Sequence, residues 1–153
     1  KTGYDGAIPS GNSIAVLIFN RLYRMTGNLR WANLSEKTLR SFSKDLKQMP
    51  SGYTAMILGF MYDAYGSKEI VVVGNGRHEE TQLLLEKLQS LYIPQKIMLF
   101  KDTNKRRDPL TKIASWTENH SMKNNKPTIY ICEDFACRLP TTDLKKAIEL
   151  IQN

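Results

Sequence analysis

The pattern of apolar and polar positions changes near residue 66 of this 153-residue chain and predicts a helical part before that point. Apolar residues there recur three and four positions apart, as they do on one face of a helix. Glycine and proline end these runs, and the breaks are short enough to join consecutive helices as antiparallel hairpins. The predicted helices span 12–25, 29–48 and 53–64.

The first predicted helix is apolar on most of its sides rather than along one stripe. Its large apolar residues are Ile14, Val16, Leu17, Ile18 and Phe19. A surface helix needs a single apolar stripe, so this helix requires partners on two sides. Three helices supply too few, and we expect that a layer of the protein lies outside this chain. In isolation, we expect the chain to cover this helix with a second copy, as a homodimer.

From residue 68 onward the pattern is that of an α/β protein. Short continuous apolar runs fit strands buried on both faces, as in parallel sheets. The predicted strands are 70–73, 97–100 and 129–132, centred on Val72, Leu99 and Tyr130. The predicted helices are 78–92, 109–119 and a last one from Thr142 or Asp143 to 151. The fold class is therefore α/β: a helical segment over 1–66, then a small three-layer domain over 67–153 with a mostly parallel sheet of three or more strands.

The composition indicates the class of protein and its location in the cell. The chain is 41% hydrophobic and 24% charged, which is typical of a globular protein, and it contains no run of ~18 apolar residues that could cross a membrane. It begins KTGYDG without an initiator Met, and we expect a fragment of a longer protein. Two cysteines do not make a secreted disulfide scaffold, so we expect a reducing, cytoplasmic location.

The net charge of +7 at pH 7 is compatible with nucleic acid, with acidic ligands or with plain solubility. The Lys and Arg residues are scattered, however, and the compact basic cluster Lys105-Arg106-Arg107 has no interleaved aromatic residues. The pattern therefore favours a solvated loop, and it disfavours nucleic acid as a partner.

A glycine-containing turn, Gly74-Asn75-Gly76, lies where a strand gives way to a helix, a place where phosphates bind. The dinucleotide motif requires a third glycine, and Glu79 occupies that position. Glu79 and Glu80 stabilise the helix start themselves and repel a phosphate. Gly74 and Gly76 remain weak phosphate-site candidates, and we expect a tight turn with no nucleotide cofactor.

The two cysteines, Cys132 and Cys137, are separated by four residues, which is not the spacing of thioredoxin-like or zinc-ribbon motifs. Three states remain open. The thiols are reduced and packed, or they form a disulfide across a tight hairpin over 129–138, or they bind a metal together with His78 and His120. We expect the reduced state and no metal, with each histidine a surface or helix-cap residue.

Several stretches of the sequence occur in the same order in one protein family. They are Tyr4-Asp-Gly-Ala-Ile-Pro-Ser-Gly-Asn-Ser13, Leu22-x-x-x-Thr26-Gly27, Val71-Val-Val-Gly74, Ile93-Pro94 and Tyr130-Ile-Cys-Glu-Asp-Phe-Ala-Cys-Arg-Leu-Pro140. Together they resemble the C-terminal third of the spermatogenesis-associated thioredoxin-like-domain proteins and their bacterial relatives. The resemblance covers essentially the whole chain.

This resemblance implies a longer protein: a thioredoxin-like domain, an (α/α)6 toroid similar to six-hairpin glycosidases and N-acylglucosamine epimerases, and a small C-terminal region. Residues 1–66 would hold the last toroid hairpins, with the first helix on the inside. The loop before it would lie at the mouth of the toroid cavity. On this basis, Asp5, Ser10 and Asn12 are candidate cavity residues.

The expected function follows from the same resemblance. The fragment would belong to a toroid protein that binds or acts on carbohydrate, inactive alone, with the rest of its own full-length chain as its partner. One alternative is a non-catalytic scaffold or protein-interaction module; another is a nucleotide or nucleic-acid binder. The sequence assigns no catalytic residue, since a glycosidase needs a second carboxylate besides Asp5, and none can be identified.

Overall fold

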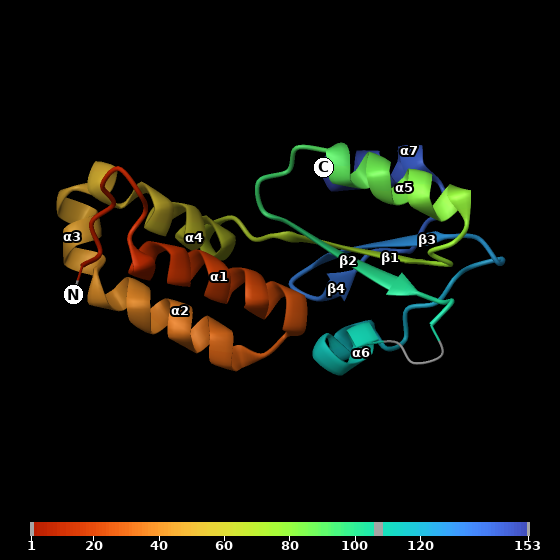
Figure 1. Ribbon diagram of the computed structural model, residues 1–153, viewed down its shortest axis with the longest axis horizontal. Coiled ribbons are helices and arrows are strands. Elements are labelled where there is room, and N and C mark those ends of the chain that lie inside the picture. The colour runs from red at the N-terminus through yellow and green to blue at the C-terminus, as the bar shows by residue number, and fades with distance from the viewer. Residues whose placement is uncertain (1, 106–108, 153) are drawn as a thin grey trace. The chain divides into compact units, whose positions relative to one another are not determined.

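The computed structural model describes residues 2–105 and 109–152. The chain divides into two compact units, Lys1–Gly66 and Ser67–Asn153, each described here by itself (Figure 1). Arg106 and Arg107 of the predicted basic cluster lie outside the described residues. No helix in the described part of the chain is long and apolar enough to cross a membrane.

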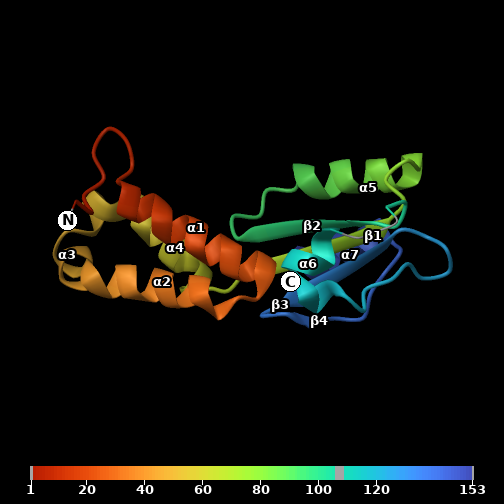
Figure 2. The same ribbon diagram turned by 60° about the horizontal axis from the view of Figure 1, so that its bottom comes forward.

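The first unit is helical. Its elements are α1 (Gly11–Thr26), α2 (Leu29–Ser41), α3 (Ser43–Gln48), a 3-10 helix η1 (Pro50–Tyr53) and α4 (Thr54–Ala64). Helix α1 packs against both α2 and α4 (Figure 2). The core of this unit consists of Val16, Phe42, Tyr53 and Met56, with Leu39 and Leu46 packed against it.

The predicted helix over 29–48 is wrong in one respect, because the structure breaks it into α2 and α3. The break is at Phe42, which has φ −113° and ψ 7° and is only 4% exposed. The turn brings the Phe42 ring into the core beside Tyr53, with ring centroids 6.3 Å apart. Burial of a large aromatic side chain thus outweighs the continuity of the helix.

Helix α1 is covered on one side and open on another. Val16 and Asn20 are buried, and Phe19 stacks on Trp31 of α2 with ring centroids 5.9 Å apart. Ile14 and Ile18, one turn apart, remain 37% and 47% exposed. The described helices therefore leave part of the apolar surface of α1 uncovered, as the sequence predicts.

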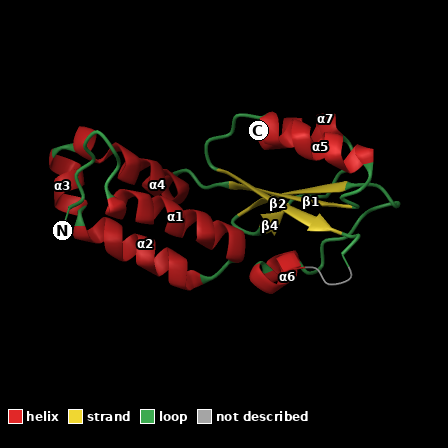
Figure 3. Cartoon of the chain, viewed as in Figure 1, coloured by secondary structure: helices red, strands yellow, loops and turns green. Residues whose placement is uncertain are grey.

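The second unit is an α/β unit, in which strands and helices alternate (Figure 3). Its elements are β1 (Lys68–Gly74), α5 (Glu79–Ser90), β2 (Lys96–Asp102), α6 (Pro109–Ile113), a 3-10 helix η2 (Ser115–Thr117), β3 (Thr128–Glu133), β4 (Ala136–Cys137) and α7 (Leu144–Gln152). The strands lie in the order β2-β1-β3-β4. The α/β class and the three predicted strand positions are confirmed.

The directions of the strands are confirmed only in part. Strands β1 and β2 are parallel, as the helix between them requires. Strand β3 is antiparallel to β1 and β4 is antiparallel to β3, so the prediction of a mostly parallel sheet is wrong. Between β1 and β2 the chain runs back along the sheet through the twelve-residue α5, whereas the described part of the connection from β2 to β3 holds the short α6 and η2, of five and three residues. Strand β3 begins beside the end of β1, with Thr128 opposite Val73.

Helices cover the two faces of this sheet unequally. Helices α5 and α7 cover one face over an apolar core of buried residues: Ile70, Val72, Leu84, Leu88, Ile129, Ile131, Ala147 and Ile151. The short α6 and η2 lie on the other side of the sheet (Figure 1). Side chains alternate along a strand, so Tyr130 and Cys132 of β3 point to this second face.

The end of α5 is capped by the first residue of the next strand. The ammonium group of Lys96 donates hydrogen bonds to the carbonyl oxygens of Leu88, Gln89 and Leu91, at 2.8, 2.9 and 2.7 Å. These carbonyls have no partner within the helix, and a cation suits the negative end of the helix dipole. Burial lowers the pKa of Lys96.

Candidate functional site

The loop before α1 uses the candidate cavity residues to fix its own conformation. Ser10 is the N-cap of α1, and its hydroxyl accepts a hydrogen bond from the backbone N–H of Ser13 at 3.1 Å. The Asp5 carboxylate accepts one hydrogen bond from the N–H of Ser10 at 2.8 Å and another from the N–H of Ala55 at 2.9 Å. Asp5 therefore connects the start of α1 to the start of α4.

The same contacts decide the ionisation of Asp5. Partial burial raises the pKa of this carboxyl, but the hydrogen bonds from Ser10, Ser13, Ala55 and Met56 together outweigh burial and leave the pKa below its usual value. Asp5 is thus a carboxylate at neutral pH, and both of its oxygens already accept hydrogen bonds. It is suited to hold two helix starts in place, and a general acid would need the opposite shift.

Asn12, the third candidate, lies in the first turn of α1, and its side-chain amide donates a hydrogen bond to the carbonyl oxygen of Thr2 at 2.8 Å. The structure thus brings Asp5, Ser10 and Asn12 together around one loop. Their observed contacts are with the loop and the helix starts themselves.

Replacing Asp5 with alanine is expected to lower the stability of the helical unit by about 1–2 kcal/mol, the usual cost of losing a helix cap. The folded-state pKa of Asp5 is depressed, so its stabilising contribution is present above the unfolded pKa of about 3.8 and disappears as the pH falls through the folded value. Thermal unfolding followed by circular dichroism should therefore separate the two proteins at pH 7 and bring them together near pH 2. A difference that is constant over this range would contradict the assigned contacts.

The turn after β1 already holds an acidic group where a phosphate would bind. The N–H of Gly76 donates a hydrogen bond to the carboxylate of Asp102 at 2.9 Å. That hydrogen bond is the main reason that the pKa of Asp102 is lowered. A Cβ atom on Gly74 would lie 2.8 Å from the Thr81 hydroxyl, so this glycine serves close packing. These contacts agree with the expectation that no nucleotide binds tightly here, which stays a prediction.

The second face of the α/β unit holds a disulfide. Cys132 in β3 and Cys137 in β4 are joined, and the expectation of two reduced thiols is wrong. The connecting turn places Asp134 and Phe135 in the left-handed region, at φ 50° and 65°, which is the conformation of a tight two-residue hairpin. The hairpin sets the two cysteines directly opposite each other, with Cα atoms 3.8 Å apart. The hairpin over 129–138 that the sequence left open is the one that forms.

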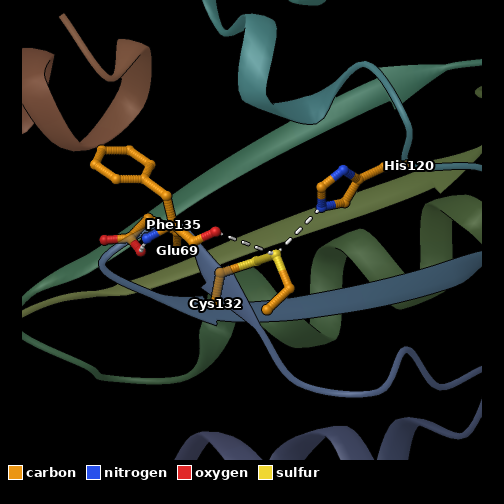
Figure 4. The surroundings of a disulfide bond; sticks show 5 residues. Glu69, His120, Cys132 and Phe135 are labelled. Carbon is orange, nitrogen blue, oxygen red and sulfur yellow. Dashed lines mark hydrogen bonds between the residues drawn. A yellow bond between two sulfur atoms is a disulfide. The ribbon is translucent and has the colours of Figure 1, made fainter.

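His120 lies against this disulfide (Figure 4). Its Nε2 atom is 3.3 Å from the sulfur of Cys137. The ring packs on Tyr130 of β3, with centroids 4.1 Å apart, and meets the edge of Trp116 at 5.8 Å. The Tyr130 hydroxyl donates a hydrogen bond to the carbonyl of Ser121, next to His120, and so holds the segment on the sheet. The sequence shows two isolated histidines, and no spacing signal indicates that one of them meets the cysteines.

The protonation state of His120 follows from its surroundings. Burial is the main cause that lowers its pKa, and the positive charge of Lys101 lowers it further, while a hydrogen bond with the backbone of Thr117 acts in the opposite direction. The Lys101 ammonium is fixed by the carbonyls of Thr117 and Glu118, at 3.0 and 2.8 Å. The imidazole beside Cys137 is therefore mainly neutral at pH 7, the form that can accept a proton.

A buried carboxylate supports the hairpin from the neighbouring strand. Glu69 of β1 is fully buried and lies directly opposite Cys132. It accepts hydrogen bonds from the Ser67 hydroxyl and, at 3.4 Å, from the N–H of Phe135 (Figure 4). The Phe135 ring meets Trp116 with centroids 5.4 Å apart. The apolar run that predicts β1 gives no sign of this role for Glu69.

The three side chains at the disulfide are also metal-ligand types. The ligand atoms of His120, Cys132 and Cys137 all lie within 4.8 Å of one another, and they form a group of three among the described residues. A closed structural zinc site has four ligands, and thiolate ligands require the disulfide to be broken first. His78, the other histidine, lies at the start of α5, where its ring nitrogen is 3.3 Å from the Asn75 amide. The expectation that the pair binds no metal stays a prediction.

Comparison with known proteins gives one consistent result. The chain is 30% identical to spermatogenesis-associated protein 20 of Rattus norvegicus over 146 residues, and 29% identical to the proteins of that name from Homo sapiens and Mus musculus. Each match covers 94% of this chain and 18% of the relative. No protein-family model and no solved structure matches. The chain is thus similar to less than a fifth of a longer protein, which supports the family resemblance of its sequence motifs.

Proposed function

We propose that this chain works as one part of a longer protein, in which its helical unit completes a larger array of paired helices. The observation that carries this proposal is the exposed apolar face of α1, where Ile14 and Ile18 are 37% and 47% exposed. The occupant of this face in the longer protein is a helix of the same polypeptide outside this chain. Most of each relative's length lies outside the matched part, which supplies room for such helices.

A second apolar surface in the same unit supports this role. Helices α2, α3 and α4 enclose a groove of about 580 Å³. Its lining residues are Glu36, Leu39, Arg40, Ser43, Leu46, Lys47, Ile57, Phe60 and Asp63. Phe60 in this groove is 47% exposed. An apolar groove formed by several neighbouring side chains is typical of a contact surface, and we infer that another helix of the longer protein covers it.

The coverage of α1 can be tested by chemical labelling. Ile18→Cys should react rapidly with a maleimide in the dilute isolated chain and much more slowly in the longer protein. Gln89→Cys, at an exposed position of α5 in the other unit, serves as the matched control and should react at similar rates in both. Equal labelling of Ile18→Cys in the two proteins would mean that no helix covers this face, and the proposal would fail.

We also propose that the longer protein binds carbohydrate at the loop over 4–13. One observation favours it: Tyr4 is 57% exposed at this loop, and an exposed aromatic ring can stack on the apolar face of a sugar. Both oxygens of Asp5 already accept hydrogen bonds, so Asp5 is not free to act as the acid of glycoside chemistry, and any catalytic group would come from elsewhere in the longer protein. Glycan-array binding by the full-length protein should therefore be lost in Tyr4→Ala and kept in Tyr65→Ala, a tyrosine 79% exposed at the end of α4.

A further inference from the structure

We propose that Cys132 and Cys137 form a thiol–disulfide exchange centre for dithiols, in which Cys137 is the reacting sulfur and His120 is its base. The α/β unit holds all three residues, so the proposal does not depend on the role of the helical unit.

The two sulfurs differ in their access to solvent. Cys132 is fully buried in the sheet, whereas Cys137 lies in an exposed two-residue strand at the edge. Exchange requires a thiolate to approach one sulfur of the disulfide directly. An external thiolate can therefore reach Cys137, and Cys132 becomes the leaving group.

His120 supplies proton transfer at the accessible sulfur. Its Nε2 atom faces the Cys137 sulfur at 3.3 Å, and a nitrogen of the same ring lies within 4.8 Å of the Cys132 sulfur. A neutral imidazole at this distance can take the proton of the Cys137 thiol, and the resulting thiolate and imidazolium stabilise each other. The same imidazolium can protonate a sulfur that leaves.

The reaction balances as a two-electron exchange. One thiolate of the dithiol attacks Cys137, the bond between the two protein sulfurs breaks, and Cys132 leaves as a thiolate that takes up a proton. The second thiolate of the reagent then attacks its own mixed disulfide and releases Cys137, which is protonated through His120. The dithiol is oxidised to a cyclic disulfide, the protein pair is reduced to two thiols, and two electrons and two protons pass between them.

The hairpin is fixed by contacts that do not need the disulfide. The β3–β4 pairing and the hydrogen bond from the Phe135 N–H to Glu69 keep the turn in place, and the ring of Phe135 is held against Trp116. The disulfide closes a loop with a sequence separation of only 5, and short loops gain the least stability from a cross-link. Reduction can therefore proceed in the folded protein. In the reducing compartment that the sequence predicts, such pairs are usually catalytic or redox-sensing.

The first test measures reduction of the unaltered chain by dithiothreitol in native buffer, with thiols trapped by N-ethylmaleimide and counted by mass spectrometry. We expect a rate proportional to the reagent concentration and faster than global unfolding. A disulfide reduced only at the unfolding rate would be purely structural, and this outcome would overturn the proposal without use of any variant.

The second test isolates the role of His120. In Cys132→Ser, Cys137 is a single thiol, and its reaction with an aromatic disulfide reports the thiolate. Adding His120→Gln, which keeps a polar nitrogen near the same place but removes the base, should slow this reaction by about tenfold or more. Adding His78→Gln is the matched control and should change nothing. Equal rates for the His120 and His78 variants, with unchanged circular dichroism, would contradict the assignment of His120 as the base.

Discussion

Replacing Ile14 and Ile18 with glutamate is expected to make the isolated chain monomeric, whereas the unaltered chain forms a dimer through α1. The two side chains lie four residues apart on the same side of the helix, and they are 37% and 47% exposed. A two-fold contact would bury each of them twice, once from each copy. Apolar burial contributes about 25 cal/mol per Å², and two carboxylates per copy would repel across the contact.

Light scattering over a concentration series measures the change, and it has a matched control. Leu83→Glu with Tyr92→Glu introduces the same charge at exposed apolar positions of the α/β unit, 51% and 92% exposed, and should leave the dimer intact. If the unaltered chain is monomeric at high concentration with α1 well ordered, then α1 needs no second copy. The proposal that a helix of the longer protein covers α1 would then be tested by the maleimide labelling experiment alone.

Replacing Gly59 with alanine is expected to destabilise the helical unit by about 1–3 kcal/mol, the usual cost of overpacking a core. In an ordinary helix interior, the same change stabilises by about 1 kcal/mol. Here α1 and α4 approach closely: a Cβ on Gly59 would lie 2.7 Å from the Val16 side chain and 2.8 Å from the backbone nitrogen of Leu17. Backbone cannot rotate away as a side chain can, so the helices must separate. Separation would also weaken the hydrogen bond at 2.8 Å from Asn20 to the Gly59 carbonyl.

Urea unfolding can report this effect in the helical unit alone. The chain has one tryptophan in each unit, Trp31 and Trp116, so Trp116→Phe as a background leaves Trp31 as the probe. Gly11→Ala is the control, because a Cβ there meets nothing within 4 Å and the residue opens α1. It should be neutral or slightly stabilising. Equal midpoints for Gly59→Ala and Gly11→Ala would show that the two helices do not pack as closely as described.

Local patterns in the sequence predict most of this fold, because they report burial directly. The continuous apolar run around Val72 predicts a strand covered on both faces, and β1 is one. The four-residue spacing of Leu84 and Leu88 predicts α5, and both residues are buried. Strand direction is different, because an apolar run looks the same in both directions. The antiparallel pairing of β3 with β1 is a long-range contact between strands, which the spacing of apolar residues within each strand does not reveal.

The candidate site is harder to predict from the sequence than the fold, because it depends on contacts between residues that are far apart in the chain. His120 reaches Cys137 only because its loop is fastened to β3 through Tyr130. Glu69 meets the hairpin turn because the β1–β3 register places it opposite Cys132. Asp5 stands out in a loop rich in glycine and serine, but its partner at Ala55 is fifty positions away in the sequence. Such long-range pairs leave no spacing pattern.

Lys96 also indicates where this chain can be lengthened by engineering. Its ammonium group donates hydrogen bonds to the last carbonyls of α5, and its backbone is the first paired position of β2. Both contacts can form together only if the connection over 91–95 keeps its present length. One added residue would pull the cap away from the helix or shift β2 by one position, which would turn Ile97 and Leu99 to the opposite face of the sheet. The turn at 124–125 is exposed and its contacts are local: a single bridge between Lys123 and Lys126, and the Thr128 hydroxyl, which accepts a hydrogen bond from the N–H of Lys123 and donates one to the carbonyl of Lys126. An inserted tag or reporter domain therefore belongs at that turn.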